Sequence, residues 1–141
     1  MTTMTLTLLL RAAGLMHLGL LCAGASMPNA VDLRANLSAL PAFIRRLFYM
    51  YFFFIGLILV SFGCMSVVFA PEMASGQPVA RGLCTVMAIF WSIRLVAAAF
   101  VFDVRPYLTN WFYRAGYQAT NLVFVYLLAV YAFAAWKGGA V

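Results

Sequence analysis

Apolar residues fall into four long runs along the chain, separated by short stretches that hold most of the prolines. The runs cover about Met4–Ala25, Phe48–Ala70, Val79–Phe102 and Ala115–Trp136. Each has about the 20 residues that a helix needs to cross a hydrocarbon core of roughly 30 Å. Backbone polar groups in lipid must be satisfied within their own segment, so these runs predict helices. The pattern therefore predicts an all-α fold, a four-transmembrane-helix bundle forming one integral membrane domain over residues 1–141.

The segment before the second run, about residues 33–47, has a different pattern. Leu33, Leu37 and Leu40 recur at helical spacing ahead of Pro41. An amphipathic segment of this kind is typical of a helix that lies in the headgroup layer. A loop that ends in positive anchors accounts for the same residues equally well.

Composition supports the membrane interpretation, because 67% of residues are hydrophobic and only 9% are charged, against about 25% charged in soluble domains. A chain of 141 residues with four such runs leaves no room for a soluble catalytic domain. A secretory signal is the alternative for the first run, since Ala23 and Ala25 precede Ser26. Against it, Arg11 interrupts the apolar core and no positive charge precedes that core.

The net charge of +6 is interpreted as a topology signal, and no basic cluster outside the membrane indicates nucleic-acid binding. Positive residues favour the cytoplasmic side of a membrane. The loops expected between the first and second runs and between the third and fourth runs carry more of them than the other face, which predicts that these loops are cytoplasmic and that both termini lie on the outer side. The basic residues of these loops are Arg34, Arg45, Arg46, Arg105 and Arg114. Those of the other face are Arg81, Lys137 and Arg11. The expected interfacial anchors are Arg45, Arg46, Arg105, Arg114 and Asp103.

Arg94 is a charged residue within the third apolar run, about 12 Å from the Phe102 end at the rise of a helix. A charge at this depth costs at least about 2.5 kcal/mol and is expected to face the bundle or a partner. No carboxylate is expected at the same level, because Asp103 lies on about the opposite helix face and is expected to pair with Arg105 or Arg114. Arg94 is thus expected to attract an anionic or carbonyl-bearing group. The candidate ligand-binding residues at similar depth are Arg94, His17, Asn121, Gln118, Tyr117 and Tyr51.

Structural explanations for the same residues stay open. Arg94 can extend its long side chain to the interface and act as an anchor. His17 fits a hydrogen-bonded packing residue, and a haem site would need a second histidine from another copy of the chain. No metal site is predicted.

The sequence offers no constellation of catalytic residues. Its three cysteines form no CxxC pair, and its three acidic residues lie near helix ends or in loops. Neither a phosphate-binding glycine loop nor a nucleophile elbow is present, so an enzyme is unsupported. Pairs of small residues, Gly19 with Ala23 and Gly56 with Gly63, predict close helix packing.

The segments "ALPAFIRRLFYMYFFFIG", "ASGQPVARGL" and "FWSIRLVAAAFVFD" give the chain a layout that resembles small, uncharacterised four-helix bacterial membrane proteins. The layout is also loosely similar to that of DoxX-type proteins, some of which are linked to quinone-dependent oxidation. With the charge pattern, the resemblance implies a protein of the bacterial inner membrane with both termini periplasmic. The leading hypothesis is a non-catalytic membrane module or accessory subunit that binds lipid or a protein partner. The alternatives are a redox component that binds a quinone-like molecule or small anion, and a small anion channel formed by a homo-oligomer.

Overall fold

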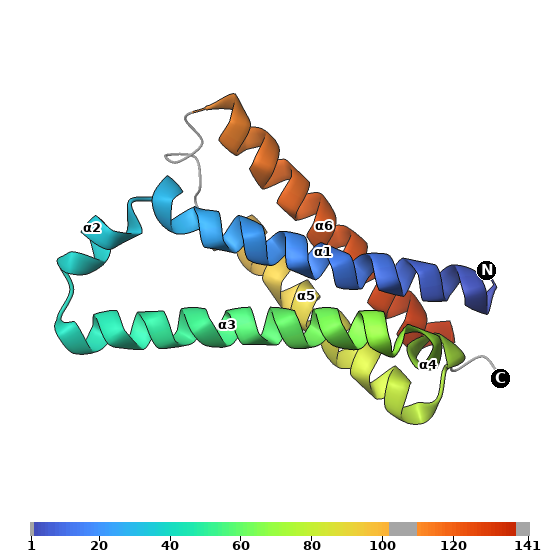
Figure 1. The fold of residues 1–141 in the computed structure, drawn as a ribbon. Coiled ribbons are helices and arrows are strands. Elements are labelled where there is room, and N and C mark those ends of the chain that lie inside the picture. Colours follow the sequence, from blue (N-terminus) through green and yellow to red (C-terminus); the bar gives the residue numbers. More distant parts are fainter. Residues whose placement is uncertain (1, 102–109, 138–141) are drawn as a thin grey trace.

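The computed structural model describes residues 2–101 and 110–137 of the chain. These residues form an all-α fold with the predicted four helices that are long and apolar enough to cross a membrane. They are α1 (Thr3–Ala30), α3 (Ala42–Val68), α5 (Pro78–Phe100) and α6 (Trp111–Lys137) (Figure 1). Two short helices, α2 (Leu33–Ser38) and α4 (Ala70–Ser75), connect α1 to α3 and α3 to α5. The chain is therefore a multi-pass membrane protein.

The helices differ from the sequence prediction in several bounds, among them the start of α6, which lies at Trp111 rather than Ala115. The amphipathic segment is confined to α2, because α3 begins at Ala42 directly after Pro41 rather than at Phe48. α1 continues through Pro28 to Ala30 instead of ending at Ala25, and α4 was not predicted. The predicted end of the third span at Phe102 lies outside the described residues, as do the predicted anchors Asp103 and Arg105.

The core lies in the part of the molecule where α1, α4, α5 and α6 meet. α1 buries one stripe of side chains spaced alternately four and three residues apart, which is the spacing of a helix face packed against neighbouring helices: Leu6, Leu10, Ala13, His17 and Leu20. α5 and α6 contribute Cys84, Met87, Trp91, Phe124, Leu127, Val130, Tyr131 and Ala134, and α4 contributes Ala70, Met73 and Ala74. Three of the four long helices thus bury one face each, and α3 buries only Gly63 and Ser66.

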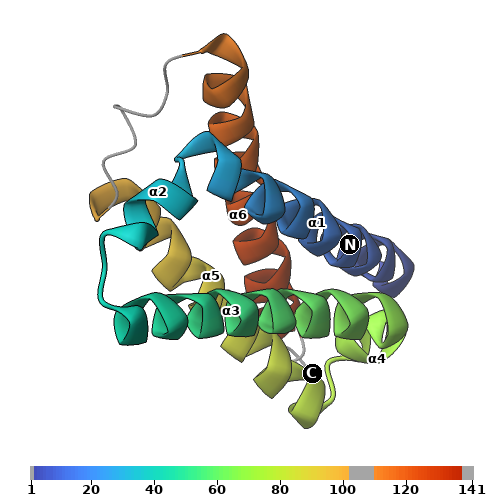
Figure 2. The same cartoon turned by 60° about the vertical axis from the view of Figure 1, so that its left-hand side comes forward.

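α1 and α3 cross closely near one end and diverge toward the other. An added Cβ at Gly14 would lie 2.8 Å from the carbonyl oxygen of Gly63, and one at Gly63 would lie 3.1 Å from the Cβ of His17. Glycine is therefore required for this approach of the two backbones. Beyond the crossing the two helices separate, and α2 spans the gap between their far ends (Figures 1 and 2). The α6 end that holds Trp111 also projects away from the other helices (Figure 2).

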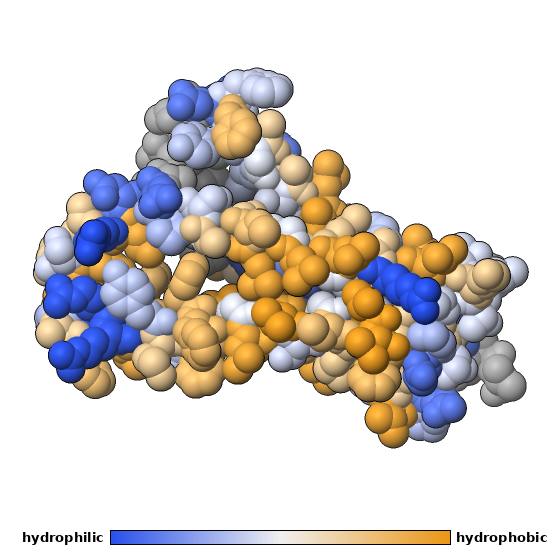
Figure 3. Space-filling model, viewed as in Figure 1, coloured by the Kyte–Doolittle hydropathy of each residue, from blue (hydrophilic) through white to orange (hydrophobic). Residues whose placement is uncertain are grey.

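The surface carries a hydrophobic band between two more hydrophilic ends. Figure 3 shows hydrophobic side chains over the middle of α1 and α3, with hydrophilic ones gathered over α2 and the start of α3. The first half of α3 exposes large apolar side chains, as a lipid-facing helix does, including Phe53 at 64% and Ile55 at 52%. Trp111 and Trp136, at opposite ends of α6, are each 81% exposed, in agreement with a role at the two membrane interfaces.

Candidate functional site: a groove between α1, α2 and α3

His17 lies in the core, where the Trp91 ring stands between it and the Phe124 ring that Arg94 contacts. Its Nδ1 donates a hydrogen bond to the carbonyl oxygen of Ala13 at 2.7 Å, which lies one turn earlier on α1. Its ring packs edge-on against Phe62, Trp91 and Tyr131, with centroid distances between 5.3 and 6.2 Å. Among the described residues no group of three histidine, cysteine or acidic side chains is placed to hold a metal ion. The surroundings of His17 are those of a packing residue.

Arg94 lies on α5 and faces α6. Its guanidinium carbon is 5.0 Å from the centroid of the Phe124 ring, a distance that allows a cation–π contact. Near this pair of helices, the hydroxyl of Tyr117 donates to the carbonyl oxygen of Ala98 at 3.4 Å, and Asn121 is partly buried. Arg94 makes further interactions within the structure.

The remaining predicted residues lie at the surface. Tyr51 is 62% exposed on the lipid-facing half of α3, and Gln118 is exposed on α6. The prediction that these residues lie at similar depth assumed that all four helices start at the same level in the membrane. Instead, His17 lies beside Gly63 of α3 and not beside the stretch from Tyr51 to Gly56, because α1 extends past the end of α3 alongside α4. The structure therefore separates the predicted set into the core, the α5–α6 pair and the surface.

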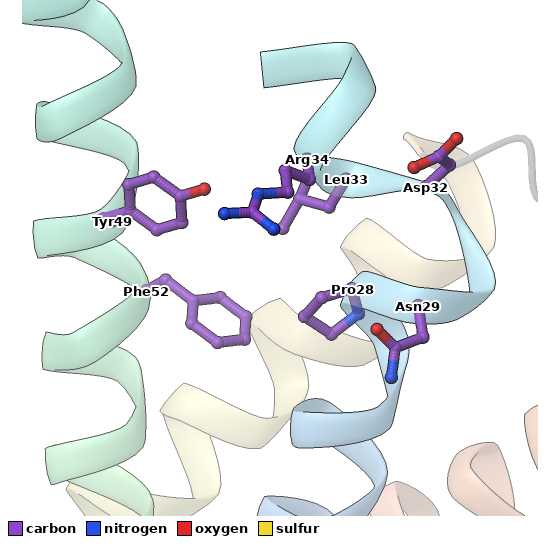
Figure 4. Close-up of a pocket in the computed structure, with 7 residues that line it drawn as sticks. All are labelled: Pro28, Asn29, Asp32, Leu33, Arg34, Tyr49 and Phe52. Atoms are coloured by element: carbon purple, nitrogen blue, oxygen red, sulfur yellow. The ribbon is translucent and has the colours of Figure 1, made fainter. Parts of the chain in front are cut away.

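A cavity of about 370 Å³ lies where α1 ends, α2 begins and the first turns of α3 pass. Figure 4 shows Arg34 of α2 extending toward Tyr49 of α3, with Phe52 below Tyr49 and facing Pro28 of α1. Arg34 provides a positive charge in the loop region between two membrane spans, where lipid headgroups are expected. The lining residues are Pro28, Asn29, Asp32, Leu33, Arg34, Tyr49 and Phe52.

A second cavity of about 390 Å³ lies next to the first, because Tyr49 and Phe52 line both. Its other lining residues are all apolar: Leu21, Phe53, Gly56, Leu57 and Val60. From Tyr49 to Val60 it follows α3 for about 17 Å at a rise of about 1.5 Å per residue. We call the two cavities together the α1–α3 groove. It is charged at the α2 end and apolar along the rest of its length.

The groove follows from the way these two helices are packed. Contact at Gly14 and Gly63 fixes one end, whereas an added Cβ at Gly56 would find its nearest atom, a methyl of Leu21, at 3.9 Å. Gly56 has no side chain to fill the widening space, and the neighbouring α3 aromatics line it instead. Sequence reasoning identified Gly56 and Gly63 as packing residues and Leu33 as interfacial, but it did not place α1 opposite α3. The sequence feature that indicates the groove is Gly56 in the aromatic run of α3, which follows a loop rich in arginine.

The fold and the groove define a four-helix integral membrane protein with an amphiphilic site open at one end of the bundle. No family model, no curated protein and no solved structure matches the chain.

Proposed function

We propose that this chain is a non-catalytic integral membrane module that binds a phospholipid in the α1–α3 groove, with the acyl chain in the apolar part and the phosphate at Arg34. The single observation that supports this most strongly is that the charged cavity and the apolar cavity lie side by side and share Tyr49 and Phe52 as lining residues. A phospholipid has the same order of chemistry, a charged group joined to a long apolar chain.

Charge and geometry both favour a lipid at this position. The guanidinium of Arg34 presents donors in a planar fork that matches phosphate oxygens. It is exposed, and its side chain makes no hydrogen bond or ion pair within the described part of the chain. The apolar cavity is lined by side chains that already face lipid, so an acyl chain there replaces bulk lipid without burying a polar group.

We further propose the bacterial inner membrane as the location, with the α2 end on the cytoplasmic side and both termini periplasmic. The supporting observation is the excess of arginine near the α2 end, where Arg34, Arg45, Arg46 and Arg114 lie. Anionic lipids of the cytoplasmic leaflet would concentrate at this end. The resemblance to small four-helix bacterial proteins agrees with this placement.

The test is native mass spectrometry of the protein released from mild detergent, with the groove filled by a substitution. Gly56→Leu places a side chain in the apolar cavity, and Gly19→Leu is the matched control because an added Cβ at Gly19 meets nothing within 4 Å. We expect a phospholipid bound one to one to the wild type and to Gly19→Leu, and its loss from Gly56→Leu. Helix content by circular dichroism checks that both variants fold.

Two outcomes would overturn the proposal. One is phospholipid retention that Gly56→Leu does not change, which would place the lipid elsewhere. The other is a protein or a quinone, in place of a phospholipid, retained by the wild type and lost from Gly56→Leu.

A further inference from the structure

The charged end of the groove carries a carboxylate as well as a guanidinium. Asp32 and Arg34 line the same cavity, and both are exposed. Neither side chain forms a hydrogen bond or an ion pair within the described residues, with each other or with a third group. The groove entrance therefore presents two opposite charges, each available to a ligand.

The two charged groups lie on different sides of the entrance. Figure 4 shows Arg34 extending toward α3, whereas Asp32 lies beyond Leu33 on the side away from Tyr49. Asp32 occupies the position before α2, where an aspartate commonly caps the helix, yet its carboxylate makes no such hydrogen bond. Its backbone adopts a left-handed conformation with φ 45° and ψ 49°, unlike the extended conformation of most capping residues. The carboxylate is thus separated from the guanidinium and is not used by the fold.

Two separated opposite charges complement a zwitterion better than an anion. A phosphate held by Arg34 would satisfy the cation and leave Asp32 beside a negatively charged ligand. A primary ammonium next to that phosphate would donate to the Asp32 carboxylate and to the side-chain oxygen of Asn29, which lines the same cavity. A trimethylammonium has no N–H to donate and would gain the charge attraction alone.

We propose that the groove selects a phospholipid with a primary-amine headgroup, of the phosphatidylethanolamine type, with its phosphate on Arg34 and its ammonium on Asp32. This inference rests on the proposed function, because it names the lipid class that the same groove takes. Choline lipids would bind more weakly because their headgroup lacks the hydrogen bonds. Glycerol lipids would bind more weakly because they leave Asp32 unpaired.

The experiment is a titration of the delipidated full-length protein by native mass spectrometry with three lipids of identical acyl chains: phosphatidylethanolamine, phosphatidylcholine and phosphatidylglycerol. We expect the wild type to bind the ethanolamine lipid about tenfold more tightly than the choline lipid, as for a charge-assisted hydrogen bond gained. Asp32→Asn should abolish this preference and retain binding of the glycerol lipid. Arg34→Gln should weaken binding of all three.

The variants are suited to the test because both positions are exposed, and asparagine tolerates the left-handed backbone conformation of position 32. Equal binding of the ethanolamine and choline lipids by the wild type, or a preference that survives Asp32→Asn, would overturn the headgroup selection while lipid binding in the groove still stands. Failure of the delipidated wild type to bind any of the three lipids would overturn the proposed function itself.

Discussion

At the scale of single residues, polar side chains connect the helices in the apolar interior. Ser66 of α3 and Tyr131 of α6 share a buried hydrogen bond with 2.6 Å between their oxygens. The hydroxyl of Tyr126 donates to the backbone carbonyl of Leu9 at 3.0 Å, and so links α6 to α1. In a bundle where lipid provides no hydrophobic drive for association, such bonds fix which helix faces meet.

The Ser66–Tyr131 bond gives a direct prediction for stability. Tyr131→Phe removes one partner and leaves the buried Ser66 hydroxyl without the other, so we expect a loss of about 0.5–1.5 kcal/mol in the free energy of unfolding. Unfolding in mixed micelles, followed by circular dichroism, measures the change. Tyr51→Phe, at a side chain 62% exposed, is the control and should change little.

A double-mutant cycle distinguishes the bond from a change in packing. If the hydroxyls interact, Tyr131→Phe combined with Ser66→Ala should cost less than the sum of the two single changes. Strictly additive losses would mean that the two groups do not stabilise each other.

The polar residues also show how far the sequence could predict the site. That His17 is a hydrogen-bonded packing residue was one of the interpretations open from its lone position among leucines, and its bond to Ala13 agrees with that interpretation. His17 lies opposite Gly63 of α3 rather than opposite Tyr51 to Gly56, because counting residues from each helix end assumes helices that start at the same level. The residues of the groove were missed because Asp32, Arg34 and Tyr49 gain their meaning only from the α1–α3 arrangement.

At the scale of elements, the position of the α1–α3 crossing determines where the groove opens. The sequence predicted Gly63 as a close-packing position but paired it with Gly56 on its own helix. The residue that meets Gly63 is Gly14 of α1, and Gly19, the glycine predicted for α1, faces open space. Small residues on one helix mark positions where a second helix could pack closely. Which of these positions makes the contact depends on the register between the two helices.

This crossing predicts opposite results for two identical substitutions on α1. An alanine Cβ at Gly14 would lie 2.6 Å from a methyl of Val67 and 2.8 Å from the carbonyl oxygen of Gly63, so the helices must separate. We expect Gly14→Ala to reduce the free energy of unfolding by about 1–3 kcal/mol. Gly19→Ala should leave it unchanged or raise it slightly, since alanine is the better helix former.

The measurement is again unfolding in mixed micelles, with helix content as the readout. Equal effects of the two substitutions would show that α1 and α3 do not meet at Gly14. The same comparison tests the groove, because a shifted crossing would change the lipid binding that Gly56→Leu probes.

At the scale of the whole molecule, the two ends of the bundle differ in their basic residues. Arg34, Arg45 and Arg46 lie at the α2 end, whereas Arg11 lies one turn beyond Gly14 toward the α4 end. At the α4 end the Nε of Arg81 donates to the carbonyl oxygen of Ala135 at 3.2 Å, so this arginine also ties α5 to α6. With four spans, the start of α1 and the end of α6 lie on the same side of the membrane, the α4 side.

The difference between the two ends predicts the orientation and a way to disturb it. A periplasm-dependent reporter enzyme fused after the C-terminus should be active in the wild type, because the arginine-rich α2 end favours the cytoplasm. By the loop assignment from the sequence, substituting Arg45→Gln and Arg46→Gln leaves three basic residues for each side, Arg34, Arg105 and Arg114 against Arg11, Arg81 and Lys137. We expect reporter activity to fall as part of the population inserts in the opposite orientation. The matched control, Arg11→Gln with Lys137→Gln, removes the same charge from the α4 end and should keep full reporter activity. An inactive reporter on the wild type would contradict the orientation and place the groove entrance in the periplasmic leaflet.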